Sequence, residues 1–155
     1  MSLESVKHFL AAKAPDLHIL TLERPSETVW LSAFLAVQPA QIAKALALRV
    51  GDRTVLLMAC GDARLSNQKL KFALGGKARM LPPEEAAAIT GHPVGGVCPF
   101  GLAAPLPVYC DTMLKRFEEV VTGGGEPRSA IRINPLRLAD VTRAEWVDVC
   151  EEPGT

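Results

Sequence analysis

The chain has 155 residues, of which 48% are hydrophobic and 22% are charged, as in an ordinary folded globular protein. The chain has 17 basic residues (Lys and Arg) and 17 acidic residues (Asp and Glu). This even charge balance argues against a protein whose main task is non-specific binding of long nucleic acid. No apolar run is long enough to cross a bilayer, and no apolar stretch precedes a cleavage site, so neither a membrane partner nor a signal peptide is expected. The sequence therefore predicts one domain, residues 1–155, in the cytoplasm.

The first predicted element is an amphipathic helix at the N-terminus. Ser2 can cap this helix, its apolar residues recur on one face, and Pro15 ends it. Segment 17–22 is short, apolar and β-prone, which favours a strand.

Two further helices are expected before the central strands. Ser26 begins one that carries Trp30 and Phe34, which lie four positions apart and therefore on one face. Pro39 suits the first turn of a third, short helix that is expected to run through Lys44.

The pattern then changes to strands. Segments 46–50 and 53–59 are β-prone and flank Gly51, which predicts a hairpin with a tight turn. A helix is expected to begin at Ser66, and Gly75 stops it in the manner of a C-cap.

The second half of the chain alternates short strands, helices and one long loop. The expected strands are 77–81, 106–110, 119–122 and 130–133, and helical turns are expected to begin at Pro83, Asp111 and Pro135. Segment 92–105 is too rich in Gly and Pro for regular structure. Because the hairpins exclude a purely parallel sheet, the expected fold class is mixed α/β.

Cysteines and histidines give no sign of a metal site. The four cysteines form no CxxC pair, and the three histidines have no metal-ligand spacing. We therefore expect free thiols in a reducing compartment, and neither a metal nor an organic cofactor.

One cluster of basic residues interrupts the even charge balance. Its members are Arg64, Lys69, Lys71, Lys77 and Arg79, with only Asp62 nearby to oppose them. Such a cluster can dock a short RNA end, and a solvated helix face explains the same residues equally well.

The loop from Gly91 to Gly101 can bind a ligand through its main chain. Gly95 and Gly96 have no Cβ, so their N–H groups can approach a carbonyl oxygen or a phosphate closely. Pro99 restricts Cys98 to extended conformations and stiffens the loop. Composition alone also fits a purely structural turn.

Taken in order along the chain, these features resemble those of the YbaK family, also described as the prolyl-tRNA-synthetase-associated editing domain. The resemblance covers nearly the full length. It includes LAVQPAQIAKAL around Lys44, and GDARL from Gly61 with the lysine-bearing helix after it. It is strongest at TGHPVGGVCPFGL, where Gly95 and Pro99 match the family's GxxxP pattern, and it closes with LPVYCDTML, in which Asp111 follows a strand.

The resemblance implies a barrel-like mixed sheet surrounded by helices, and a trans-editing hydrolase that removes wrong amino acids from tRNA, most often tRNA for proline. It implies that Lys44 is needed for activity, either by anchoring the terminal adenosine or by polarising the ester. The loop with Gly95 and Gly96 is implied to hold the aminoacyl end and to supply N–H donors. Water would attack with help from the substrate's own ribose hydroxyl. A synthetase partner would help to select the tRNA.

Other residues of the loop and its surroundings are candidates for substrate contact. They are His92, Val97, Cys98, Pro99, Phe100, Gly101 and Asp111. His92 can donate to the substrate, although an exposed loop histidine is the commoner outcome. Cys98 invites a covalent mechanism, but with no partner histidine in view it is expected to pack or to line the pocket. Asp111 suits a helix cap better than a general base.

Two departures from the family pattern affect specificity. Ala45 follows the lysine where the family commonly has Thr or Asn, and Cys98 stands where Ser is common. Trp30 and Phe34 can wall a pocket for a small amino acid such as alanine, cysteine or serine, or can belong to the core. Two other functions stay open: a tRNA-end-binding module without turnover, which Ala45 favours, and an enzyme for another small ester.

Overall fold

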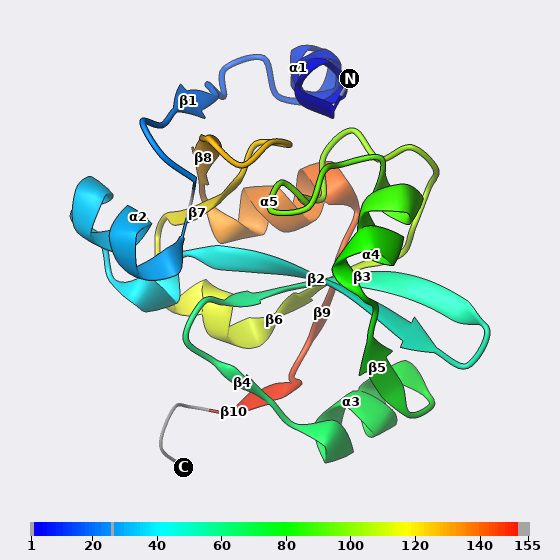
Figure 1. Cartoon of the computed structure of the whole chain (residues 1–155). Coiled ribbons are helices and arrows are strands. Elements are labelled where there is room, and N and C mark those ends of the chain that lie inside the picture. Colours follow the sequence, from blue (N-terminus) through cyan, green and yellow to red (C-terminus); the bar gives the residue numbers. More distant parts are fainter. Residues whose placement is uncertain (1, 26, 152–155) are drawn as a thin grey trace.

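The computed structural model describes residues 2–25 and 27–151 (Figure 1). The helices are α1 (Ser2–Lys13), α2 (Thr28–Leu35), η1 (Pro39–Gln41), α3 (Asn67–Leu74), α4 (Pro83–Thr90), η2 (Thr112–Arg116) and α5 (Pro135–Thr142), of which η1 and η2 are 3-10 helices. The strands are β1 (Leu20–Thr21), β2 (Ala43–Val50), β3 (Arg53–Cys60), β4 (Arg64–Leu65), β5 (Ala78–Met80), β6 (Val108–Asp111), β7 (Val120–Gly123), β8 (Ser129–Ile133), β9 (Glu145–Val147) and β10 (Cys150–Glu151).

The strands form a central mixed sheet and two smaller sheets. The five-stranded sheet has the order β5-β2-β3-β6-β9, with β2 antiparallel to both of its neighbours and β6 parallel to both of its own. The order β1-β8-β7 gives an antiparallel three-stranded sheet, and β4 pairs with β10. A parallel bridge between Ile42 and Val121 links the three-stranded sheet to the start of β2. The expected mixed α/β class is confirmed.

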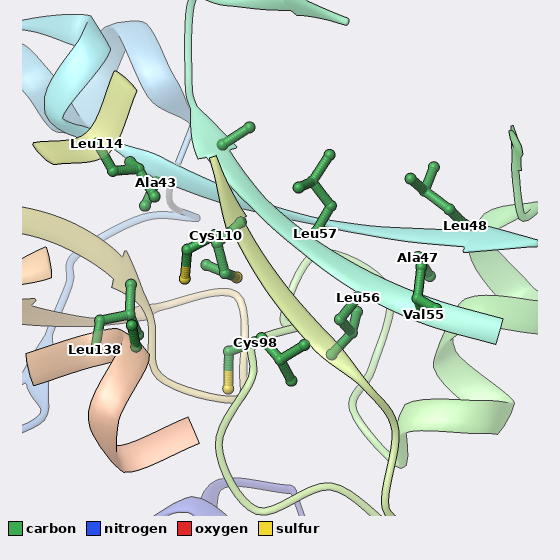
Figure 2. Packing of buried hydrophobic residues seen from close by; sticks show 14 of the residues in the cluster. Ala43, Ala47, Leu48, Val55, Leu56, Leu57, Cys98, Cys110, Leu114 and Leu138 are labelled. Atoms are coloured by element: carbon green, nitrogen blue, oxygen red, sulfur yellow. The ribbon is translucent and has the colours of Figure 1, made fainter. Parts of the chain in front are cut away.

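The hairpin of β2 and β3 is the centre of the fold. Its register runs from Ala43 opposite Cys60 to Val50 opposite Arg53, and Gly51 has the positive φ of 63° that the tight turn requires. Residues 55–60 are all buried, so both faces of β3 are covered. Figure 2 shows Leu48 and Leu57 on one side of the hairpin, with Ala47 and Leu56 on the other side. This continuous burial explains why the sequence of β3 shows no alternation.

Local signals placed the helix ends correctly. Ser66 accepts a hydrogen bond from the Lys69 N–H at the start of α3, and Gly75 ends that helix with a φ of 79°. Gly91 ends α4 with the same φ. Ser26, the expected start of the second helix, lies outside the described residues, and α2 begins at Thr28.

The expected third helix was wrong beyond its first turn. The 3-10 helix η1 stops at Gln41, where the Gln41 Oε1 accepts the N–H of Gln38 at 3.0 Å. Lys44 lies in β2, opposite Ala59. Pairing with β3 satisfies the backbone of this segment along its whole length, and this long-range ladder overrides the local preference for helix.

Three short strands were missed, and a fourth was predicted longer than it is. Strand β1 covers two residues of the expected 17–22, and β4, β9 and β10 were not predicted.

None of the helices in the described part of the chain combines the length and apolar character that a bilayer crossing requires.

Candidate functional site

A cavity of about 290 Å³ lies beside the first half of β2. Its walls come from α2, β2, the end of β5, α4 and the loop after it, and β7. The lining residues are Thr28, Leu31, Ile42, Ala43, Lys44, Ala45, Leu46, Ala47, Met80, Leu81, Pro83, Ala86, Val94, Gly95, Val97, Thr122 and Gly123. Segments far apart in the sequence therefore meet at one hollow.

The cavity exists because β5 is shorter than β2. Strand β5 pairs with β2 only along Leu48–Val50, and the Leu81 N–H then donates to the Ala47 oxygen at 3.0 Å. Between the Ile42–Val121 bridge and that point, this edge of β2 pairs with no strand among the described residues. Residues 43–46 line the cavity instead, so main-chain polar groups lie in its wall beside the apolar side chains.

Lys44 is held at the start of β2 by the turn after β3. Its Nζ donates to the Ala63 oxygen at 3.2 Å, and its side chain is partly buried. The turn approaches closely because Gly61 has no side chain: a Cβ there would lie 2.8 Å from the Ile42 oxygen. An ammonium group has three donors, so Lys44 keeps donors for a ligand in the cavity.

Only one of the two loop glycines presents its backbone to the cavity. Gly95 is exposed, lines the cavity and has a φ of 84°. No backbone carbonyl in the described part of the chain accepts its N–H. Gly96 instead donates to the Pro93 oxygen at 2.8 Å, and a Cβ on it would lie 2.7 Å from the Glu126 Cα. The expectation that Gly96 offers its N–H to substrate was therefore wrong, because a tight turn uses that donor.

Thr122 is a cavity residue that the sequence did not reveal. It is 2% exposed, and its Oγ1 is buried without a hydrogen-bond partner among the described residues. Strand β7 reads as an ordinary β-prone segment, so no sequence signal marks this hydroxyl. Thr28, Leu31 and Met80 were missed for the same reason: chain folding alone brings them to the cavity.

Comparison with known proteins identifies the family. The family model of the aminoacyl-tRNA editing domain matches residues 26–141, a range that contains the entire cavity lining. The chain belongs to this family. The Bacillus subtilis protein YwhH, which is itself uncharacterized, is 41% identical over 155 residues, with 98% of this chain and 99% of that protein covered.

The editing domain also matches part of larger enzymes. A proline–tRNA ligase of Geobacter sp. is 35% identical over 122 residues, which cover 77% of this chain and 21% of the ligase. This chain thus spans about a fifth of the length of such ligases. The crystal structure of a candidate trans-editing enzyme for prolyl tRNA synthetase superposes with a TM-score of 0.90 at 30% identity, covering 97% of both chains. The crystal structure of the hypothetical protein APE2540 superposes with a TM-score of 0.88 at 27% sequence identity. The match covers 95% of this chain and 99% of that protein.

His92 and Cys98 support the loop of the editing domain from inside. His92 is 1% exposed, which contradicts the expected surface position, and its Nε2 lies 2.7 Å from the Phe100 oxygen. A carbonyl only accepts, so this nitrogen carries its proton and cannot serve Cys98, whose Sγ lies 3.6 Å away, as a base. Burial raises the pKa of Cys98 to about 12 and lowers the pKa of His92. A neutral thiol is a poor nucleophile, so the pair is structural.

Four further candidates lie outside the cavity lining. Pro99 and Phe100 are buried, and the Phe100 ring packs against Phe9 with centroids 5.8 Å apart. Gly101 lies against α1, where a Cβ would come within 2.6 Å of the Ser5 backbone. The fully buried Asp111 accepts the N–H of Met113 at 3.0 Å and that of Val149 at 2.9 Å. These residues hold the loop and the sheet in place, and Val97 is the other loop candidate that lines the cavity with Gly95.

The aromatic pair of α2 lies beside the cavity lining and is not part of it. Trp30 and Phe34 stack with centroids 5.0 Å apart, and Arg24 covers Trp30 at 5.0 Å. Phe34 is 54% exposed, so it is not a core residue either. Thr28 and Leu31 are the residues by which α2 lines the cavity.

Proposed function

We propose that this editing domain hydrolyses the ester between a small, wrongly attached amino acid and the 3′ end of tRNA for proline. The observation that carries the proposal is the meeting of Lys44 and Gly95 at one cavity in a chain of this family. The volume of about 290 Å³ is near the lower limit of ligand sites, which suits a small aminoacyl group better than a large one.

The cavity lining supports direct attack by water. Among the described residues, its only side-chain hydroxyls are those of Thr28 and Thr122, and none of the lining residues is a Cys or a His. The water oxygen bonds to the ester carbonyl carbon, the bond to the ribose oxygen breaks, and that oxygen leaves as a hydroxyl. The neighbouring ribose hydroxyl of the substrate orients the water.

Lys44 and the Gly95 N–H stabilise the charge that develops on the ester oxygen. A cation and a fixed N–H donor need no reorganisation when the tetrahedral intermediate forms. A small site also selects by exclusion, because larger side chains do not fit.

We propose that prolyl-tRNA synthetase, as a partner in trans, selects the tRNA. In the proline–tRNA ligases that match, the similar segment is one part of a larger enzyme. We place the reaction in the cytoplasm, where charged tRNA is made and used, with residues 1–155 acting as one domain.

The test uses purified protein with tRNA for proline that carries alanine, cysteine, serine or proline. We expect loss of one or more small wrong amino acids, sparing of proline, and a loss of rate of about 100-fold or more in Lys44→Ala. Lys13→Ala, which removes an exposed lysine from α1, is the matched control and should keep full activity.

A second candidate function, a tRNA-end-binding module without turnover, rests on Ala45. This residue lines the cavity beside Lys44, and its methyl group adds no polar atom to the site. If no charged tRNA loses its amino acid, even with the synthetase present, this second function replaces the first. If hydrolysis survives in Lys44→Ala, the lysine has no part in the reaction.

A further inference from the structure

Positive charge is concentrated in the segment around α3 and β5. Residues 63–83 contain five Lys or Arg and no Asp or Glu, whereas the whole chain has equal numbers of both. Lys69 is neutralised, because its Nζ lies 3.0 Å from the Asp148 carboxylate. Lys71, Lys77 and Arg79 are exposed, and none of them has a carboxylate partner in the described part of the chain. The protein therefore has a local basic surface although its net charge is zero.

An aromatic side chain projects from the same surface. Phe72 is 93% exposed, the largest exposure among the large hydrophobic residues of the described chain. Leu70 and Leu74 on the buried face of α3 already anchor the helix, so Phe72 contributes nothing to the core. It lines a shallow depression together with Gln68, Lys71 and Gly75.

Helix α3 and the cavity lie on the same face of the sheet, whereas Arg79, which pairs with Arg49, points to the other face. Met80 pairs with Leu48, and residues two or four apart on a strand point to one side, so Met80 and Lys44 lie on the same face of the sheet. Met80 is 55% exposed and lines the cavity. The turn after α3 packs on that face too, since a Cβ on Gly76 would lie 3.3 Å from Val50 Cγ1. Figure 1 shows α3 directly beside β5.

We infer that the α3–β5 surface, made of Lys71, Phe72 and Lys77, binds the unpaired nucleotides next to the terminal adenosine of the tRNA. Phosphates lie along the two basic side chains, and one base stacks on Phe72. Exposed aromatics interleaved with basic side chains are the usual means of binding single-stranded nucleic acid. The inference rests on the proposed function, because it places the nucleotides that precede the one in the cavity.

The test compares binding of uncharged tRNA for proline to matched double variants by fluorescence anisotropy at several salt concentrations. Lys71→Gln/Lys77→Gln should weaken binding about tenfold at low salt and lower the slope of log affinity against log salt by about 1.4. Lys7→Gln/Lys13→Gln removes the same charge from α1 and should bind like the wild type. Phe72→Ala should weaken binding about tenfold with little change in the slope.

Binding of uncharged tRNA separates this inference from the proposed hydrolysis. Lys44→Ala should lose deacylation and keep the salt slope. If the α3–β5 variants lose binding while no tRNA is ever deacylated, the surface is correct and the proposed function is not. The inference is overturned if these variants bind tRNA like the α1 control. It is equally overturned if Phe72→Ala converts a dimer into a monomer in sedimentation without changing tRNA affinity.

Discussion

Thr122 is a single residue whose buried hydroxyl lowers stability. Its hydroxyl is buried in the cavity wall and has no partner in the described chain. A buried polar group without a partner costs about 1–3 kcal/mol. A substrate hydroxyl or ammonium group in the cavity would satisfy it.

Thr122→Val tests this role, because valine has the same shape and no hydroxyl. The free energy of unfolding should rise by about 1 kcal/mol while kcat/KM for charged tRNA falls about tenfold. Chemical denaturation and deacylation rates measure the two quantities. Thr122→Ser keeps the hydroxyl and should keep most of the activity. A stabilised Thr122→Val with unchanged kcat/KM would show that the hydroxyl is a packing defect only.

Gly61→Ala tests whether the turn after β3 positions Lys44. The added Cβ would lie within 2.9 Å of the Pro39 and Ile42 oxygens, so the turn must move and the Ala63 oxygen must leave Lys44 Nζ. We expect kcat to fall about tenfold. Gly75→Ala is the control: it places Ala at a φ of 79° in open space, and should lower the melting temperature and leave kcat unchanged. Equal kcat values in the two variants would remove Gly61 from the positioning of Lys44.

His92 predicts a pH dependence of stability. Burial lowers its pKa below the usual 6.5, so the folded protein keeps it neutral while the unfolded chain takes up a proton in acid. The stability is therefore complete above about pH 6.5 and falls as the pH drops below that value. His92→Gln cannot gain this proton, and its unfolding free energy should fall less between pH 7 and pH 5 in urea titrations. Parallel pH profiles would contradict the assignment.

At the scale of elements, α2 shows why helical spacing alone did not locate the specificity pocket. Trp30 and Phe34 do share a face, as their spacing predicts, and they stack on each other. The residues of α2 that line the cavity are Thr28 and Leu31. The face of a helix that meets a cavity depends on the strands that pack beside the helix. The sequence of the helix alone does not specify those strands.

Leu31→Val should therefore widen the range of accepted amino acids, because it shortens a side chain that lines the cavity and is 2% exposed. We expect proline, which the proposed function predicts the wild type to spare, to be removed at a measurable rate, with a stability loss of about 1 kcal/mol. The measurement is deacylation of each charged tRNA in turn. Phe34→Ala is the control, and the assignment fails if Phe34→Ala widens the range and Leu31→Val does not.

Elements with local signals were predictable, and those held by distant partners were not. The Ser66 cap and the glycines at the ends of α3 and α4 act within one helical turn, so sequence reasoning found them. Strand β4 has two residues and exists because β10, more than 80 positions later, pairs with it. Lys44 was assigned to a helix for the same reason, since its strand is specified by β3.

For the whole molecule, complete burial of the four cysteines predicts low thiol reactivity. All four are free and buried, and burial raises their pKa values to about 11 for Cys60 and about 12 for the other three. Native protein at pH 8 should resist iodoacetamide, and denatured protein should take up four groups by mass spectrometry. Rapid native labelling would show that a cysteine is accessible in solution.

The sequence by itself determined the mixed α/β class, the hairpin, the helix caps and the family resemblance, and it named Lys44 and the glycine loop as candidates. These features depend on residue type and short spacing, which are visible in one dimension. Only the tertiary structure decided that Gly95 lines the cavity while Gly96 packs against a turn, that His92, Cys98 and Asp111 are buried supports, and that Thr122 and Leu31 line the site. A cavity forms where β5 ends before β2 does, and that mismatch is a property of strands brought together from separate parts of the chain.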